Sequence, residues 1–269
     1  MTGIYHNNIS RYIIMLCFCF LIIDGLNKED SWKAFFDNID QNKYRIVVNA
    51  KFPEKVESEF LKKYLIKDSI SCEWGKYELI NAELKLYAEG LLLGCKNFIL
   101  LSESHIPLHN FDKIWNELIK DDNEKVYYIL NPKHGCHSKK RHYINNIMNW
   151  NLDKRWVIAS QWKILTDKCV SYLIDNQIKI YDIFNKVPIP DEYALVTFLL
   201  ETSYPNVINQ ETTFVNWKEK SRKTKYRSLP RTYDDKELCD NLIRKLKTKY
   251  LFMRKIARTC HVNNNLILN

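Results

Sequence analysis

A short apolar run near the middle of the chain ends abruptly in polar residues that could bind a ligand. Phe98 to Leu101 has no alternating polar residues, which is typical of a strand buried on both faces. The run Ser102-Glu103-Ser104-His105 follows it, and Pro107 prevents a helix from continuing. Because ligands bind beyond the carboxyl ends of strands in open α/β sheets, these side-chain oxygens could form the floor of a binding site. The alternative is an ordinary strand end that leads into a helix at residues 110–119.

A second group of polar residues lies between residues 187 and 193, where two prolines precede two acids. Pro190 and Asp191 are typical of a helix start, so we expect Asp191 to cap backbone N–H groups there. Glu192 would then lie in the first turn, where the helix dipole stabilises a carboxylate. A first-turn acid with no further role is the alternative to a functional carboxylate at Glu192.

The net charge of +9 indicates an anionic partner, which could be nucleic acid, a membrane surface or a phosphorylated small molecule. Most of the positive excess lies between Lys218 and Arg258. The cations there are not interleaved with aromatic residues as in a single-strand binder, and no known nucleic-acid-binding module occurs. We therefore expect no nucleic-acid partner.

Histidine and cysteine residues give little support for a metal site. His134, Cys136, His137 and His142 lie close together, but their spacing matches no common structural zinc pattern. The 8 cysteines contain no Cys-x-x-Cys pair, and several lie in apolar runs. This pattern favours buried free thiols in a reducing compartment over a disulfide framework.

Apolar runs of strand length alternate with helical patterns along the chain. Strands are expected at residues 13–23, 45–50, 70–74, 98–101, 125–130 and 212–217. Helices are expected at residues 54–64, 78–93, 110–119, 167–175, 194–200 and 234–247, with another capped by Ser31. The alternation predicts an α/β fold with a mostly parallel central sheet and helices on both faces. Without repeats or a convincing linker, a single domain over residues 1–269 is the simplest organisation.

The first apolar run, Ile13 to Ile23, has two interpretations. It is about a dozen residues long, shorter than the ~20 that span a bilayer, and it is rich in β-branched and aromatic residues. We interpret it as the first buried strand and expect a cytoplasmic protein, with membrane association possible but not expected. The alternative is a signal anchor over residues 11–23, which would place the protein in a membrane such as that of the Golgi.

Seven short blocks resemble those of one family in order and spacing. They are Cys72 to Glu83, Phe98 to Leu108, Trp156 to Lys163, Pro190 to Tyr193, Phe214 to Trp217, Leu229 to Arg231 and Leu251 to Lys255. From about Arg11 to Ile256 the chain resembles the core-2/I-branching β-1,6-N-acetylglucosaminyltransferases, and most of all their plant-type and giant-virus members. One departure is Ala159, where the family's third block usually has glycine.

This resemblance implies a GT-A-like fold whose Rossmann-like nucleotide-sugar-binding half lies at about residues 11–130, with an acceptor and catalytic half at about 131–260. It also implies an inverting transfer of N-acetylglucosamine, xylose or another sugar from a UDP-sugar donor to a glycan or glycoprotein acceptor. No cofactor and no metal are expected. Most GT-A enzymes hold a metal with an Asp-x-Asp motif, whereas Ser102-Glu103-Ser104 stands at that place and the chain contains no Asp-x-Asp.

The resemblance also assigns roles to individual residues. Glu192 matches the catalytic base, and Arg231 and Lys255 match the basic pair that binds the donor diphosphate, with Arg254 as a possible substitute. The donor and acceptor pocket is expected to include Trp74, Gly75, Ser102, Glu103, Ser104, Ser160, Gln161, Trp162, Asp191 and Trp217. A catalytically inactive homologue that binds a sugar or nucleotide is the alternative.

Overall fold

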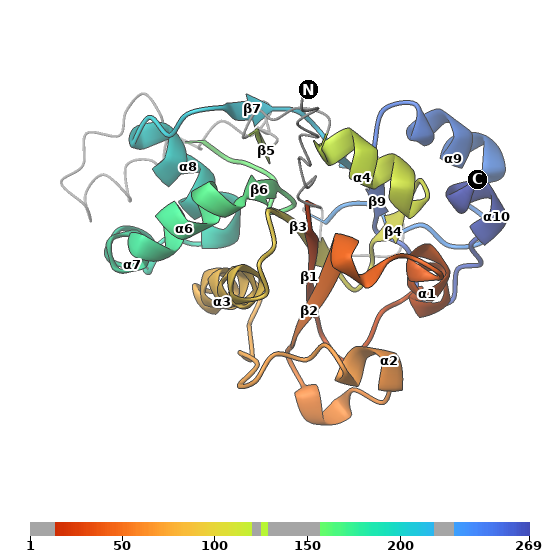
Figure 1. The fold of residues 1–269 in the computed structure, drawn as a ribbon, viewed down its shortest axis with the longest axis horizontal. Helices are drawn as coiled ribbons and strands as arrows, with labels where there is room; N and C mark the ends of the chain where they lie inside the picture. The colour runs from red at the N-terminus through yellow and green to blue at the C-terminus, as the bar shows by residue number, and fades with distance from the viewer. Residues whose placement is uncertain (1–13, 120–124, 129–156, 218–228) are drawn as a thin grey trace, which may run out of the picture.

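The computed structural model describes residues 14–119, 125–128, 157–217 and 229–269. These residues form a six-stranded sheet with strand order β2-β1-β3-β6-β5-β7, seen nearly edge-on in Figure 1. The strands are β1 (Leu16–Ile22), β2 (Tyr44–Ala50), β3 (Asn97–Ser102), β5 (Val126–Tyr128), β6 (Ile164–Thr166) and β7 (Val207–Asn209). Within this described sheet β6 runs antiparallel to its two neighbours, and the remaining pairs are parallel. The predicted α/β fold with a mostly parallel sheet is confirmed.

A second sheet of three short strands, in the order β4-β9-β8, joins segments that are far apart in the sequence. Its strands are β4 (Ile106–Pro107), β8 (Thr213–Val215) and β9 (Phe252–Arg254). Because β9 pairs with β4, the residues after β9 lie beside the turn that follows β3. The backbone N–H of Ile256 donates to the carbonyl of Ser104 at 3.0 Å.

Helices cover both faces of the large sheet (Figure 1). They are α1 (Glu29–Phe36), α2 (Glu59–Lys62), α3 (Glu78–Leu92), α4 (Phe111–Ile119), α6 (Asp167–Asp175), α7 (Gln177–Phe184), α8 (Ala194–Glu201), α9 (Asp240–Lys247) and α10 (Asn264–Leu268). Figure 1 shows α3, α6 and α7 on one side and α1 and α4 on the other. Among the described helices none is both long and apolar enough to cross a membrane.

Strand β1 is buried along its whole length and divides its side chains between two cores. Cys17, Cys19 and Leu21 pack towards α3, α6 and α8, whereas the even-numbered residues from Leu16 to Ile22 pack towards α1 and α4. This division follows from the two-residue period of a strand. The apolar run at residues 13–23 therefore contains a core strand, which spans Leu16–Ile22. The cysteines in the described part of the chain are free thiols, and they are buried as predicted except for the half-buried Cys72 and the exposed Cys239.

Two of the predicted elements are wrong. The helix expected at residues 54–64 is a 3₁₀ turn, Pro53–Lys55, followed by the four-residue α2. The segment expected to be a strand at residues 70–74 pairs with no strand among the described residues. Its first residue, Ile70, instead exchanges two hydrogen bonds with the side chain of Asn49, at 2.7 and 2.9 Å. This side chain satisfies backbone groups that a sheet ladder would otherwise bind.

Other boundaries differ more modestly from the predictions. Ser31 lies inside α1 and donates to the Asn264 side chain at 2.6 Å, so it does not cap the helix. The helix expected at residues 234–247 begins only at Asp240, after a turn at Asp234 that closes two backbone hydrogen bonds. The segment with the clustered histidines, 129–156, and the first part of the basic region, 218–228, lie outside the described residues.

Candidate functional site

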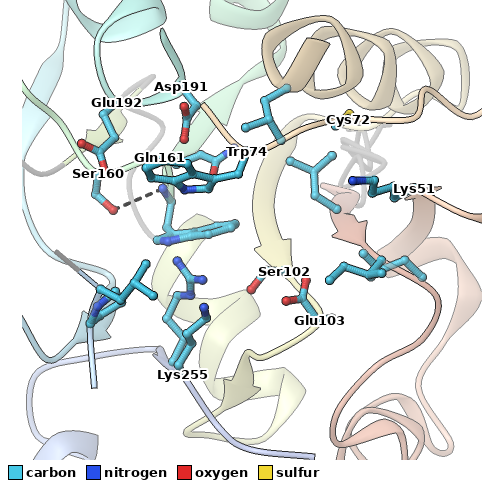
Figure 2. Close-up of a pocket in the computed structure, with 18 of the residues that line it drawn as sticks. Lys51, Cys72, Trp74, Ser102, Glu103, Ser160, Gln161, Asp191, Glu192 and Lys255 are labelled. Atoms are coloured by element: carbon cyan, nitrogen blue, oxygen red, sulfur yellow. Dashed lines mark hydrogen bonds between the residues drawn. The ribbon is translucent and has the colours of Figure 1, made fainter. Parts of the chain in front are cut away.

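A cavity of about 340 Å³ lies at the carboxyl ends of β1, β2 and β3 (Figure 2). This is where an open parallel sheet binds its ligands, and the volume suits a small molecule. Its lining comprises Leu21, Ile22, Ile23, Asn49, Lys51, Cys72, Trp74, Leu79, Ser102, Glu103, Ser160, Gln161, Trp162, Asp191, Glu192, Trp217, Leu229, Pro230, Arg254 and Lys255. The cavity therefore joins residues from the whole described length of the chain.

Most of the site residues predicted from the sequence line this cavity. They are Trp74, Ser102, Glu103, Ser160, Gln161, Trp162, Asp191, Glu192, Trp217, Arg254 and Lys255. Gly75, Ser104 and Arg231 do not line it. The Gly75 carbonyl accepts a hydrogen bond from Ile189, Ser104 is buried, and the Arg231 guanidinium forms an ion pair with Glu237 at 2.9 Å.

The end of β2 contributes residues that the sequence analysis missed. Asn49 is buried and forms two hydrogen bonds with the backbone of Ile70, whereas Lys51 extends towards the cavity from the same strand end in Figure 2. Cys72 and Leu79 complete this end of the lining. The sequence could have indicated these residues, because the carboxyl ends of neighbouring parallel strands such as β1, β2 and β3 meet at one edge of the sheet.

The turn after β3 is held in place by buried hydrogen bonds. The backbone N–H of Ser102 donates to Nδ1 of His105 at 2.8 Å, so this nitrogen carries no proton. Burial and the nearby charge of Arg254 lower the pKa of His105 well below its usual value, and the ring is therefore neutral. The carbonyl of Glu103 accepts from the backbone N–H of Asn27 at 2.8 Å. These contacts fix the backbone from which the Glu103 side chain projects.

Two adjacent cations, Arg254 and Lys255, lie at the end of β9 and line the cavity. The Arg254 guanidinium is 4.1 Å from the centre of the Trp162 ring, a cation–π distance. Burial lowers the pKa of Arg254 to about 10, partly offset by acidic neighbours such as Glu103, so the side chain remains charged at neutral pH. Burial and the charge of Arg254 lower the pKa of Lys255. A bound polyanion would relieve the repulsion between these two cations.

Asp191 and Glu192 lie on a 3₁₀ turn, Pro190–Glu192, that precedes α8. Ile189 enters the turn with φ 56° and ψ 54°, a left-handed conformation that is rare for a β-branched residue. The backbone carbonyl of Glu192 accepts from the N–H of Ala159 at 2.8 Å, which ties the turn to the segment containing Gln161. Such a strained backbone at a site persists because the surrounding structure holds it.

The expectation that Asp191 caps the following helix is wrong. Neither the 3₁₀ turn nor α8 has a side-chain cap. Asp191 is 9% exposed, and its Oδ1 atom has no hydrogen-bond partner among the residues that the structure describes. Burial raises the pKa of this carboxyl from 3.8 to about 6. One oxygen of this carboxylate is therefore held at the cavity without a hydrogen bond from the described residues, although buried charges are usually hydrogen-bonded.

A buried ion pair behind the cavity was also missed by the sequence analysis. Lys163, directly after Trp162, donates to Glu83 on α3 at 2.6 Å, and both side chains are almost fully buried. The hydroxyl of Tyr87 donates to the same carboxylate oxygen at 2.8 Å. The sequence could have indicated this pair, because Glu83 lies within the apolar face of α3 and buried acids are normally paired. The pair joins α3 to the segment that carries Gln161.

The family model described as Core-2/I-Branching enzyme matches residues 16–247, and the chain therefore belongs to this family of glycosyltransferases. The sequence is similar to Glycosyltransferase BC10 of Oryza sativa subsp. japonica, with 24% identity over 168 residues. That alignment covers 60% of this chain and 41% of the rice protein, so the chain spans less than half of that relative. The crystal structure of mouse xyloside xylosyltransferase 1 in its apo form is similar over 76% of each chain, with 12% identity and a TM-score of 0.36.

Proposed function

We propose that the protein is an inverting glycosyltransferase that moves a sugar from a UDP-sugar to a hydroxyl of a glycan acceptor without a metal ion. The observation that carries this proposal is one cavity lined by a carboxylate, Glu192, and by the adjacent cations Arg254 and Lys255. Family membership supports sugar transfer, and the mostly parallel sheet agrees with a GT-A-like fold.

Glu192 is the proposed general base. In the reaction the acceptor oxygen attacks the anomeric carbon while its proton passes to the Glu192 carboxylate. The bond from the anomeric carbon to the diphosphate oxygen breaks on the opposite side, and UDP leaves with the electron pair. The attack from the opposite side inverts the configuration. A positioned base of this kind contributes roughly 10²–10⁴-fold to the rate.

Arg254 and Lys255 are the proposed binding site for the diphosphate. The leaving UDP gains negative charge in the transition state, so fixed cations stabilise it more than they stabilise the bound donor. Arginine can bind two phosphate oxygens at once, and lysine acts as a point charge. Arg231 has a weaker claim to this role because its guanidinium is paired with Glu237 outside the cavity lining.

The exposed tryptophans at the cavity are the proposed surface for sugar rings. The side chains of Trp74 and Trp217 are 69% and 45% exposed, although tryptophan is usually well buried. Their flat apolar faces suit the C–H faces of pyranose rings, while the polar edges of those rings face water or polar residues. The opposite end of the cavity, near Asn49 and Lys51, is left for the nucleoside.

Transfer can be tested by incubating the purified protein with a panel of UDP-sugars and saccharide acceptors, in EDTA and in Mn²⁺. We expect UDP release that depends on both substrates, a product of inverted anomeric configuration by NMR, and equal rates in EDTA. Donor binding without any transfer would support an inactive homologue. A retained configuration would contradict the mechanism, and activity that EDTA abolishes and Mn²⁺ restores would contradict metal independence.

A further inference from the structure

Three buried polar atoms among the residues that line the cavity have no hydrogen-bond partner within the described part of the chain. They are Oδ1 of Asp191, Nε2 of Gln161 and Nε of Arg254. Most buried polar groups in folded proteins are paired, and an unpaired one costs the full desolvation penalty of that group. Four further unpaired buried atoms lie elsewhere in the described part of the chain, and the three at this cavity are the ones that a bound ligand could reach.

Asp191 and Gln161 approach the cavity from two different segments. Asp191 belongs to the turn before α8, and Gln161 lies just before β6. The hydrogen bond from Ala159 to Glu192 joins these segments. In Figure 2 both side chains lie on the side of the cavity nearer Glu192, away from Lys51. The two side chains thus offer one acceptor and one donor at the same end of the cavity.

We propose that Asp191 and Gln161 recognise one substituent of the transferred sugar, which donates to Oδ1 of Asp191 and accepts from Nε2 of Gln161. The carboxylate only accepts and the amide nitrogen only donates, so the substituent must do both. A hydroxyl and an acetamido group can do both, whereas a ring position that carries only hydrogen cannot. The two residues are therefore specificity-determining residues for the donor.

The position of the cations identifies the transferred sugar as the group that is bound. This step rests on the proposed function, in which Arg254 and Lys255 bind the diphosphate. The transferred sugar is the next group along the donor, and its anomeric carbon must lie near Glu192, the chain neighbour of Asp191. Asp191 is also close enough to Arg254 for its charge to act on the guanidinium. The nucleoside extends from the other end of the diphosphate.

The proposal can be tested by comparing dissociation constants for UDP with those for UDP-glucose, UDP-N-acetylglucosamine and UDP-xylose by calorimetry. The variants are Asp191→Leu and Gln161→Met, which keep the approximate size and remove the hydrogen-bonding groups. Matched controls are Asp182→Leu and Gln177→Met, which change exposed residues of α7. UDP-glucose and UDP-N-acetylglucosamine differ at one substituent, so their ratio shows whether a hydroxyl or an acetamido group is recognised.

In both variants we expect the affinity for the preferred UDP-sugar, relative to that for UDP, to fall at least ~10-fold, because a hydrogen bond to a buried group is lost. The controls should leave this ratio unchanged. An unchanged ratio in both variants, or an equal loss for UDP and UDP-sugar, would overturn the inference. Should Asp191→Leu not fold, the ratio in Gln161→Met decides the question alone. A wild-type protein that binds neither UDP nor any UDP-sugar would overturn the proposed function as well, which distinguishes the two failures.

Discussion

Replacing Asp191 by asparagine should stabilise the fold at neutral pH, although the residue lines the candidate site. Burial raises the pKa of the Asp191 carboxyl from 3.8 to about 6, so the folded state holds this proton more tightly than the unfolded state. The difference between these values corresponds to roughly 3 kcal/mol of lost stability when the group is ionised. Asparagine has nearly the same shape and no charge to desolvate. Ionised Asp191 therefore lowers stability at the site, which is typical of a functional residue.

The pH dependence of this effect follows from the sign of the shift. Below about pH 4 the carboxyl is protonated in both states, and Asp191→Asn should have little effect. The destabilisation of the wild type develops as the pH rises from about 4 to 6 and is complete above that range. Urea unfolding of both proteins between pH 4 and 8 measures this effect, with Asp182→Asn, at an exposed position of α7, as the control. A variant less stable than the wild type at pH 7.5 would refute the reasoning, because it would mean that the carboxylate makes favourable bonds in the folded state.

Three further predictions concern the cations and the core. Lys255→Met should weaken UDP binding and should reduce the rate of transfer still more, whereas the control Lys236→Met, at an exposed site, should change neither. Equal UDP affinities of the two variants in calorimetry would contradict this. Glu83→Gln or Lys163→Met alone should destabilise the fold by about 3–5 kcal/mol in urea unfolding, because each leaves one buried group without its partner. The double variant should be clearly more stable than the less stable single variant, and equal stability of the two would contradict this. Gly90→Ala should cost about 1–3 kcal/mol, because its Cβ would lie 2.5 Å from a buried thiol; a melting temperature equal to that of the wild type would disprove the close approach.

The sequence was most successful in predicting helices and strands that a short run of apolar and polar residues is enough to identify. The helix at residues 167–175 was predicted with the bounds of α6, and β1 and β3 were predicted to within a few residues. Alternating strands and helices also indicated a parallel sheet. The reversed direction of β6 and the small sheet containing β9 could not be predicted, because they depend on pairing between residues far apart in the chain.

The candidate site shows a similar division. The family resemblance indicated Glu192 as the base and Arg231 and Lys255 as the basic pair, with Arg254 as a possible substitute. The structure places Glu192, Arg254 and Lys255 at one cavity. The resemblance did not show that Arg231 pairs with Glu237 or that Asp191 has an unpaired oxygen. Both facts depend on which side chains meet in the folded state. A local rule for helix starts gave Asp191 a capping role that its three-dimensional surroundings exclude.

The most direct test of the proposed mechanism is the turnover of Glu192→Gln under saturating donor and acceptor. Glutamine keeps the shape of the side chain and removes its basicity, so transfer should fall at least ~10²-fold while UDP affinity and the melting temperature stay close to those of the wild type. Glu57→Gln, at an exposed site outside the cavity lining, is the control and should transfer at the wild-type rate. A Glu192→Gln protein that retains most of its turnover would show that another group takes the acceptor proton and would contradict the mechanism.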